Sequence, residues 1–156
     1  MTKARLVASV AAALVAMNAV GPAAAATATC FQSADIEAEQ AIRYQTEVMV
    51  ISDTCSSDSY RDFTVHTRTA IIAYQNQLID RFRRAGARSP RASLDSFLTE
   101  MANERALATG RERSDLVCQR SVALLAEAKT MSAEQFRHHI ASLAAESGKG
   151  YRRCAG

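Results

Sequence analysis

Glycine and proline are missing from a long internal part of this sequence. Neither residue occurs between Pro22 and Gly86, a run of 63 residues. Because glycine and proline are the strongest breakers of regular structure, their absence favours helices. Apolar residues recur at helical spacing in the same run, and the chain shows no paired strand-like segments, repeats or low-complexity stretches. The sequence therefore predicts an all-α protein.

Closely spaced cysteines are also missing. The nearest two of the four, Cys30 and Cys55, are 25 residues apart. The C-x-x-C pairs favoured by structural zinc and the C-x-x-C-H motif that attaches c-type haem are therefore absent. A phosphate-binding loop, a catalytic triad and a paired-carboxylate pattern are not recognisable either. We therefore expect no metal site and no cofactor, and the sequence identifies no catalytic residue.

The N-terminus has the order of a secretory signal peptide. Basic Lys3 and Arg5 precede the uncharged run LVASVAAALVAMNAV, residues 6–20, and small residues follow. That order is typical of an exported precursor, and cleavage after Ala26 or Ala28 fits equally well. An uncleaved anchor is disfavoured because the apolar run is shorter than the ~20 residues that span a bilayer. The sequence thus predicts a signal peptide over residues 1–26.

The expected mature chain, residues 27–156, has the length of a single domain. Cleavage removes two of the 19 basic residues and leaves 17 against 16 acidic ones. A nearly neutral exported protein gives no reason to expect a nucleic-acid partner. We expect a periplasmic or extracellular protein with no membrane span after cleavage, while its oligomeric state is not predictable. A lipidated Cys30 is disfavoured because Thr29 is a poor residue before such a cut.

Five helices with short connections are expected from the periodicity and from capping signals. The first helix is expected over residues 34–53, and the second extends from a cap at Ser57 to Gly86. The third extends from Ser89-Pro90 to Gly110, the fourth begins at Ser114, and the fifth follows a Ser132–Gln135 capping box. Short connections favour an up-and-down bundle. In the second helix, Val65, Ile72 and Ile79 form a flanking row that predicts contact with two neighbours.

The helix order restricts the disulfide bonds. About 20 helical residues separate Cys30 from Cys55 by ~30 Å, whereas a bridge needs Cα atoms roughly 4.4–6.8 Å apart. In an up-and-down bundle, Cys55 and Cys118 meet at one end, and Cys30 and Cys154 can join the termini. We therefore favour Cys55–Cys118 with Cys30–Cys154 over the rival set, Cys30–Cys118 with Cys55–Cys154. Bridged cysteines are not nucleophiles.

The stretches EAEQAIRYQTEVMVISDTC, residues 37–55, and DLVC, residues 115–118, resemble those of an uncharacterised family of small exported bacterial helical proteins with disulfides. The resemblance covers most of the expected mature chain. It implies a helical fold and supports the Cys55–Cys118 pair. It supplies no catalytic residues that could be transferred to this sequence.

The strongest local charge feature is the segment RFRRAGARSPR, which contains no acidic residue. Its basic side chains are Arg81, Arg83, Arg84, Arg88 and Arg91. Cations at a helix C-terminus complement the helix dipole, so a solvated corner is one interpretation. The other is a contact surface for an acidic protein or an anionic component of the cell envelope, because the next helix begins there and its free N–H groups favour anions.

Histidine and methionine supply the remaining candidates. Glu134 and His138 lie one helical turn apart, but a metal would need ligands from another helix. Met49, Met101 and His139 could ligate haem, although methionine at helical spacing is more often a packing residue. Gln45 falls on an apolar face, where it is expected to anchor an internal network.

Three functional hypotheses follow from these features. The first is a non-enzymatic interaction or binding module of the cell envelope. The second is a bundle that holds a metal or haem, and the third is an enzyme with an unrecognised site.

Overall fold

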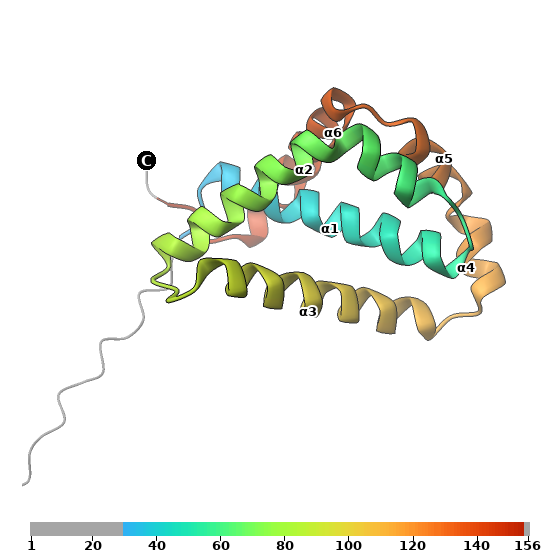
Figure 1. Ribbon diagram of the computed structural model, residues 1–156, viewed down its shortest axis with the longest axis horizontal. Coiled ribbons are helices and arrows are strands. Elements are labelled where there is room, and N and C mark those ends of the chain that lie inside the picture. Colours follow the sequence, from blue (N-terminus) through green and yellow to red (C-terminus); the bar gives the residue numbers. More distant parts are fainter. Residues whose placement is uncertain (1–29, 155–156) are drawn as a thin grey trace, which may run out of the picture.

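The computed structural model describes residues 30–154, so the predicted signal peptide and its cleavage site lie outside the described residues. The described part is an all-α bundle with no strand, which confirms the predicted fold class (Figure 1). It contains six α-helices rather than five: α1 Ser33–Thr54, α2 Ser59–Arg84, α3 Pro90–Gly110, α4 Ser114–Arg120, α5 Val122–Thr130 and α6 Ala133–Ser147. A 3₁₀ turn, η1 Gly148–Gly150, follows α6.

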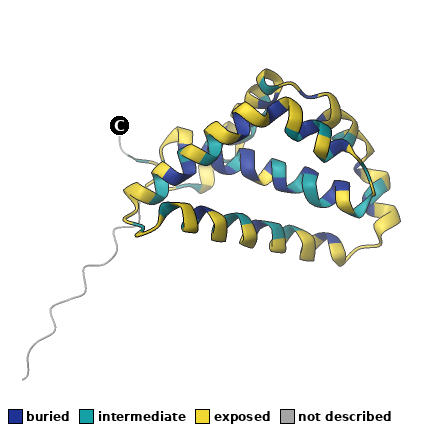
Figure 2. Cartoon of the chain, viewed as in Figure 1, coloured by how far each residue is buried: buried dark blue, intermediate teal, exposed yellow. Residues whose placement is uncertain are grey.

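Helix α1 is the central element. It contacts α2, α3 and α6, and α2 and α3 run antiparallel to one another on either side of it (Figure 1). Ala38, Ala41 and Val48 on α1 are completely buried. Buried residues follow α1 and the inward sides of its neighbours, while α2 and α3 expose their outward sides (Figure 2). The long segment without glycine or proline thus supplies the two helices, α1 and α2, that share the most contact.

The apolar core has two parts along α1. In the first, Tyr44, Phe63 and Phe136 pack together, and the Phe63 and Phe136 rings meet edge to face at 5.2 Å. In the second, Ile42 packs with Leu78 of α2 and with Leu94 and Met101 of α3. Burying each large apolar side chain contributes about 1.5–3 kcal/mol to folding, so both parts hold their helices firmly.

Several predicted helix ends are present in the structure. Gly86 follows α2 with a positive φ of 81°, a conformation that favours glycine, and Pro90 occupies the first turn of α3. Ser132 and Gln135 form the predicted capping box of α6. The first helix is capped by Gln32 and Asp35, which form a capping box, and Ser33 is its first residue.

The predicted fourth helix is two helices, which accounts for the sixth. Ser121, which is buried, separates α4 from α5, and its N–H donates to the carbonyls of Val117 and Cys118. α4 contacts α1 and α3, whereas α5 packs mainly on α2. The chain therefore changes direction between two packing partners at a point where the sequence has neither glycine nor proline.

Both disulfides have the pairing that the helix order favours. Cys30 is bonded to Cys154 with Cα atoms 4.7 Å apart, and Cys55 is bonded to Cys118 with Cα atoms 5.5 Å apart. Helix α1 contains 22 residues and is about 33 Å long, so the two bridges lie near its opposite ends. Among the described residues, no helix is long and apolar enough to cross a membrane.

Candidate functional site

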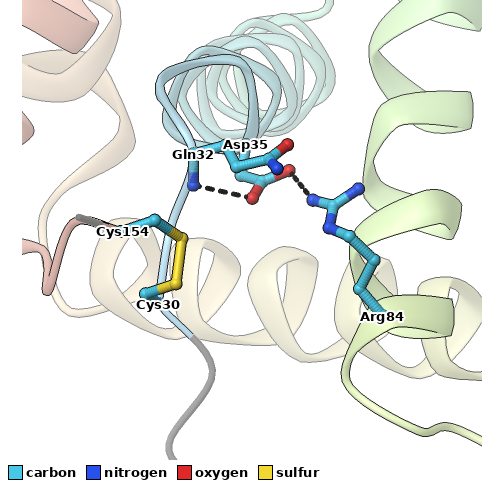
Figure 3. The surroundings of a disulfide bond; sticks show 5 residues. All are labelled: Cys30, Gln32, Asp35, Arg84 and Cys154. Atoms are coloured by element: carbon cyan, nitrogen blue, oxygen red, sulfur yellow. Dashed lines mark hydrogen bonds and ion pairs between the residues drawn. A yellow bond between two sulfur atoms is a disulfide. The ribbon is translucent and has the colours of Figure 1, made fainter. Parts of the chain in front are cut away.

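The five arginines of the RFRRAGARSPR segment lie at the end of α2, in the following turn and at the start of α3, and they have two different surroundings. Arg84 forms an ion pair with Asp35 of α1, with Nη2 2.6 Å from Oδ1 (Figure 3). The carboxylate of Asp35 is completely buried and also accepts hydrogen bonds from Gln77 Nε2 at 2.8 Å and from the Gln32 N–H at 2.9 Å. Arg84 is thus a structural link between α1 and α2.

The surroundings of Asp35 favour its charged form. Burial by itself would raise the pKa of Asp35, but the hydrogen bonds from Arg84, Gln32 and Gln77 and the Arg84 charge together lower it below its ordinary value of 3.8. Removing one partner of such a buried pair leaves the other groups unsatisfied, so the pair holds α1 against α2.

Arg81 is also held within the structure. Its guanidinium carbon lies 4.0 Å from the centroid of the Phe31 ring, within the range of a cation–π contact. Phe31 in turn packs edge to face on Tyr151, with ring centroids 4.9 Å apart. Arg81 therefore ties the end of α2 to the two terminal segments.

The terminal segments form a closed unit, here called the terminal clasp, which consists of residues 30–32 and 151–154. The Phe31 N–H donates to the Arg152 carbonyl at 2.8 Å, and the Cys30–Cys154 bond joins the same two segments. The Tyr151 hydroxyl donates to Glu39 at 2.9 Å and accepts from Gln40 Nε2 at 3.1 Å. Burial first, and then the Glu39 charge and hydrogen bond, raise the pKa of Tyr151 above 10.0.

The other three arginines are Arg83, Arg88 and Arg91, and they are here called the free arginine group because none of them pairs with a buried acid among the described residues. All three are exposed, and together they line one surface depression of about 560 Å³. Asp80 is the single acid that lines it, and Asp80 pairs with Arg83. Arg88 and Arg91 have no ion-pair partner in the described part of the chain. The structure thus divides the predicted cluster: these three arginines line the depression, whereas Arg81 contacts Phe31 and the partly exposed Arg84 pairs with Asp35.

The predicted flanking row of α2 is only partly buried. Ile79 is 9 % exposed and packs in the second part of the core, but Val65 is 69 % exposed and Ile72 is 45 % exposed. Val65, Ile72 and Arg83 are spaced 7 and 11 residues apart, so they lie on one side of the helix. These three residues define the outer face of α2, which ends at the free arginine group.

A larger groove lies at the opposite end of the bundle. It has a volume of about 640 Å³ and is lined by the C-terminal parts of α1 and α3, the start of α2 and the adjoining turns. Met49 and Tyr60 are among its lining residues. The hydroxyl of Tyr60 accepts a hydrogen bond from Gln45 Nε2 at 3.2 Å, while Gln45 Oε1 is buried and has no partner among residues 30–154. Gln45 therefore joins an internal contact as expected, but only through its amide nitrogen.

The histidine and methionine candidates do not form a common site. His139 packs edge to face on Tyr44 at 4.8 Å, Met101 lies in the core and Met49 lines the groove. Among residues 30–154, no group of three or more histidine, cysteine, aspartate and glutamate side chains is close enough to hold a metal ion. Tyr44 has a buried hydroxyl without a hydrogen-bond partner in this part of the chain, and burial, followed by the charges of Glu127 and Glu47, raises its pKa to about 12.

The chain matches no protein-family model, and no curated protein or solved structure matches it significantly. Any inference about function therefore rests on this chain's own residues. Sequence reasoning missed the groove, because its walls come from three helices far apart in the chain. It also gave no indication that the Asp35 carboxylate, in the first turn of α1, is buried against Arg84.

Proposed function

We propose that the protein is an exported, non-enzymatic binding module that contacts an acidic protein of the cell envelope through the outer face of α2 and the free arginine group. The observation that carries this proposal is the exposure of Arg83, Arg88 and Arg91 around one depression that a single acid lines. Guanidinium groups bind carboxylates in a planar, two-pronged geometry, so the depression suits an acidic partner.

The outer face of α2 favours a protein over a small anion. Val65 and Ile72 expose apolar side chains on the side of α2 that carries Arg83, and the 18 positions from Val65 to Arg83 extend over about 27 Å of helix. Surfaces that combine exposed apolar residues with arginine are typical of protein interfaces. An acidic partner with apolar residues alongside its carboxylates would complement both parts of this surface.

The disulfides support the exported location. Both bridges close long loops, with 124 residues separating Cys30 from Cys154 and 63 separating Cys55 from Cys118. Disulfides persist in oxidising compartments such as the periplasm and the extracellular space. The predicted signal peptide is consistent with that route.

Charge reversal of the free arginine group tests the proposal. The test variant carries Arg88→Glu with Arg91→Glu, because neither side chain has an ion pair to lose within the described residues. The matched control carries Arg111→Glu with Arg137→Glu, which changes the net charge equally at exposed positions outside the group. Both immobilised variants and the wild type are incubated with a cell-envelope extract from the native source.

We expect the test variant to keep the thermal unfolding midpoint of the wild type and to capture about tenfold less of the partner protein, while the control captures wild-type amounts. Equal capture by all three proteins would overturn the proposal. Phosphatidylglycerol vesicles provide a second arm. If the test variant loses vesicle binding and retains protein capture, the group binds lipid and the proposed partner is wrong.

A further inference from the structure

The groove at the disulfide-linked end of α1 is a separate feature from the proposed partner surface. It lies where α1 ends and α2 begins, whereas the free arginine group lies where α2 ends and α3 begins (Figure 1). Its volume of about 640 Å³ lies within the ~300–1,000 Å³ of small-molecule sites. The Cys55–Cys118 bond, with Cys55 directly after α1, fixes this end of the bundle covalently.

The inner lining of the groove is mainly apolar. Met49 and Val50 of α1, Tyr60 of α2 and Ala106 of α3 contribute hydrocarbon and ring surface from three helices. Methionine is unbranched and adapts its shape to different apolar groups. This apolar surface suits an aliphatic or aromatic ligand body, and nine polar or charged side chains also line the groove.

One hydroxyl group of the groove lining makes no hydrogen bond within the described residues. Thr109 of α3 lines the groove and is only 5 % exposed. Its hydroxyl forms no hydrogen bond with any other described residue. Because the hydroxyl is not among the buried polar atoms that lack a partner, it is accessible to solvent and can hydrogen-bond to water or to a ligand in the groove.

The charges at the groove determine the class of ligand. Asp53, Asp58 and Glu112 line it together with one cation, Arg61. Arg61 pairs with Asp58, and Glu112 pairs with Arg120. Asp53 is exposed and has no ion pair in the described part of the chain. The groove thus combines an apolar interior with one unneutralised carboxylate, the complement of an apolar molecule that carries a single positive charge.

We propose that this groove binds a small amphiphilic cation, with the apolar body against Met49, Tyr60 and Ala106 and the ammonium group beside Asp53. This inference is independent of the proposed partner, because no residue is shared between the groove and the free arginine group. Binding would leave the acidic-partner surface accessible, so the two sites can be tested separately.

Isothermal titration calorimetry with decyltrimethylammonium below its micelle concentration is the test, with decyl sulfate and decanol as probes of the same chain length. We expect one ammonium per protein chain, with decyl sulfate and decanol binding at least tenfold more weakly. Asp53→Asn should weaken ammonium binding about fivefold, as expected for an exposed charge. The matched Asp80→Asn variant at the free arginine group should bind as the wild type does.

A groove-filling variant, Ala106→Phe, gives a second measurement. Ala106 is exposed, so the larger side chain projects into the groove without crowding the core. We expect this variant to retain the unfolding midpoint and to bind the ammonium at least tenfold more weakly. Absence of ammonium binding to the wild type, equal affinity for decyl sulfate, or unchanged binding by Ala106→Phe would each overturn the proposal. Sedimentation could also show that the wild type is a dimer and that Ala106→Phe is a monomer. That result would assign the groove to contact with a second copy of the chain and would overturn the proposal.

Discussion

Arg84 Nη2 lies 2.6 Å from Oδ1 of Asp35, a carboxylate that is completely buried in the first turn of α1. The two residues are 49 positions apart in the chain. One arginine from the most basic segment of the sequence therefore links α1 to α2 through this ion pair, while 41 % of its side chain remains exposed. The same end of the molecule carries Arg88 and Arg91, which are exposed and line the depression of the free arginine group.

Replacement of Asp35 by Asn should lower the free energy of unfolding by about 2–3 kcal/mol. The buried carboxylate accepts three hydrogen bonds, and removing one member of a buried pair leaves its partners unsatisfied. Asp80→Asn is the matched control, because Asp80 pairs with Arg83 at the surface and should contribute less than about 1 kcal/mol. Urea denaturation measures both values, and equal losses would contradict the structural role of Asp35.

The contribution of Asp35 should depend on pH in the acidic range. Because the pKa of Asp35 is lower in the folded protein than its ordinary value of 3.8, its contribution is complete above that value and is lost as the pH falls toward the folded-state pKa. The difference in unfolding free energy between the wild type and Asp35→Asn should therefore be constant from about pH 5 to 7 and shrink below about pH 4. If the difference in unfolding free energy instead grows as the pH falls, the pKa of Asp35 is not lowered in the folded protein.

Two tyrosines should respond in opposite ways to loss of the hydroxyl group. Tyr151 donates to Glu39 and accepts from Gln40, so Tyr151→Phe should lower the free energy of unfolding by about 1–1.5 kcal/mol. The Tyr44 hydroxyl is buried without a partner in the described part of the chain, so Tyr44→Phe should be neutral or stabilising by up to about 1 kcal/mol. Chemical denaturation at neutral pH measures the free energy of unfolding of both variants. A Tyr44→Phe protein that is less stable than the wild type would contradict the prediction.

The alkaline range tests Tyr44 independently. Its pKa is raised to about 12, so the unfolded chain loses the tyrosine proton near pH 10 while the folded protein retains it. Stability that is complete below about pH 10 should therefore decrease as the pH rises from 10 to 12. Tyr44→Phe should show a smaller alkaline decrease than the wild type in denaturation measured at successive pH values.

Each disulfide should contribute several kcal/mol. In the chain-entropy treatment, a loop of the size closed by Cys55–Cys118 contributes about 4 kcal/mol, and the longer loop closed by Cys30–Cys154 contributes about 5 kcal/mol. Denaturation of the paired Cys→Ala variants, one pair at a time, measures these contributions. An unchanged denaturation midpoint in either variant would mean that its bridge does not restrain the unfolded chain.

The helices could be predicted because their signals are local. The segment without glycine or proline, Gly86 after α2 and the Ser132–Gln135 capping box each act over a few residues. The favoured disulfide pairing could be predicted from the length of α1, because a helix of that length keeps Cys30 too far from Cys55 to bond with it. The break at Ser121 was missed because it arises from packing on different neighbours and not from a local signal.

The division of the arginines could not be predicted from the sequence. Arg83 and Arg84 are adjacent and chemically identical, and only the position of α1 beside α2 decides that Arg84 meets Asp35. The groove has the same origin, since Met49, Tyr60 and Thr109 are brought together by three helices that cross at one end. Such sites depend on tertiary contacts between distant segments, and periodicity along one helix carries no information on them.

The central claim, that the basic segment divides into a structural arginine and free arginines, is tested most directly by measuring stability and partner capture on the same two proteins. Arg84→Ala should lower the free energy of unfolding by about 2 kcal/mol, because it leaves a buried carboxylate unpaired, and the folded fraction should capture wild-type amounts of the acidic partner. Arg88→Ala with Arg91→Ala should unfold as the wild type does and lose capture. The account would be contradicted if Arg84→Ala were as stable as the wild type but lost capture of the partner, while the Arg88→Ala, Arg91→Ala double variant was destabilised.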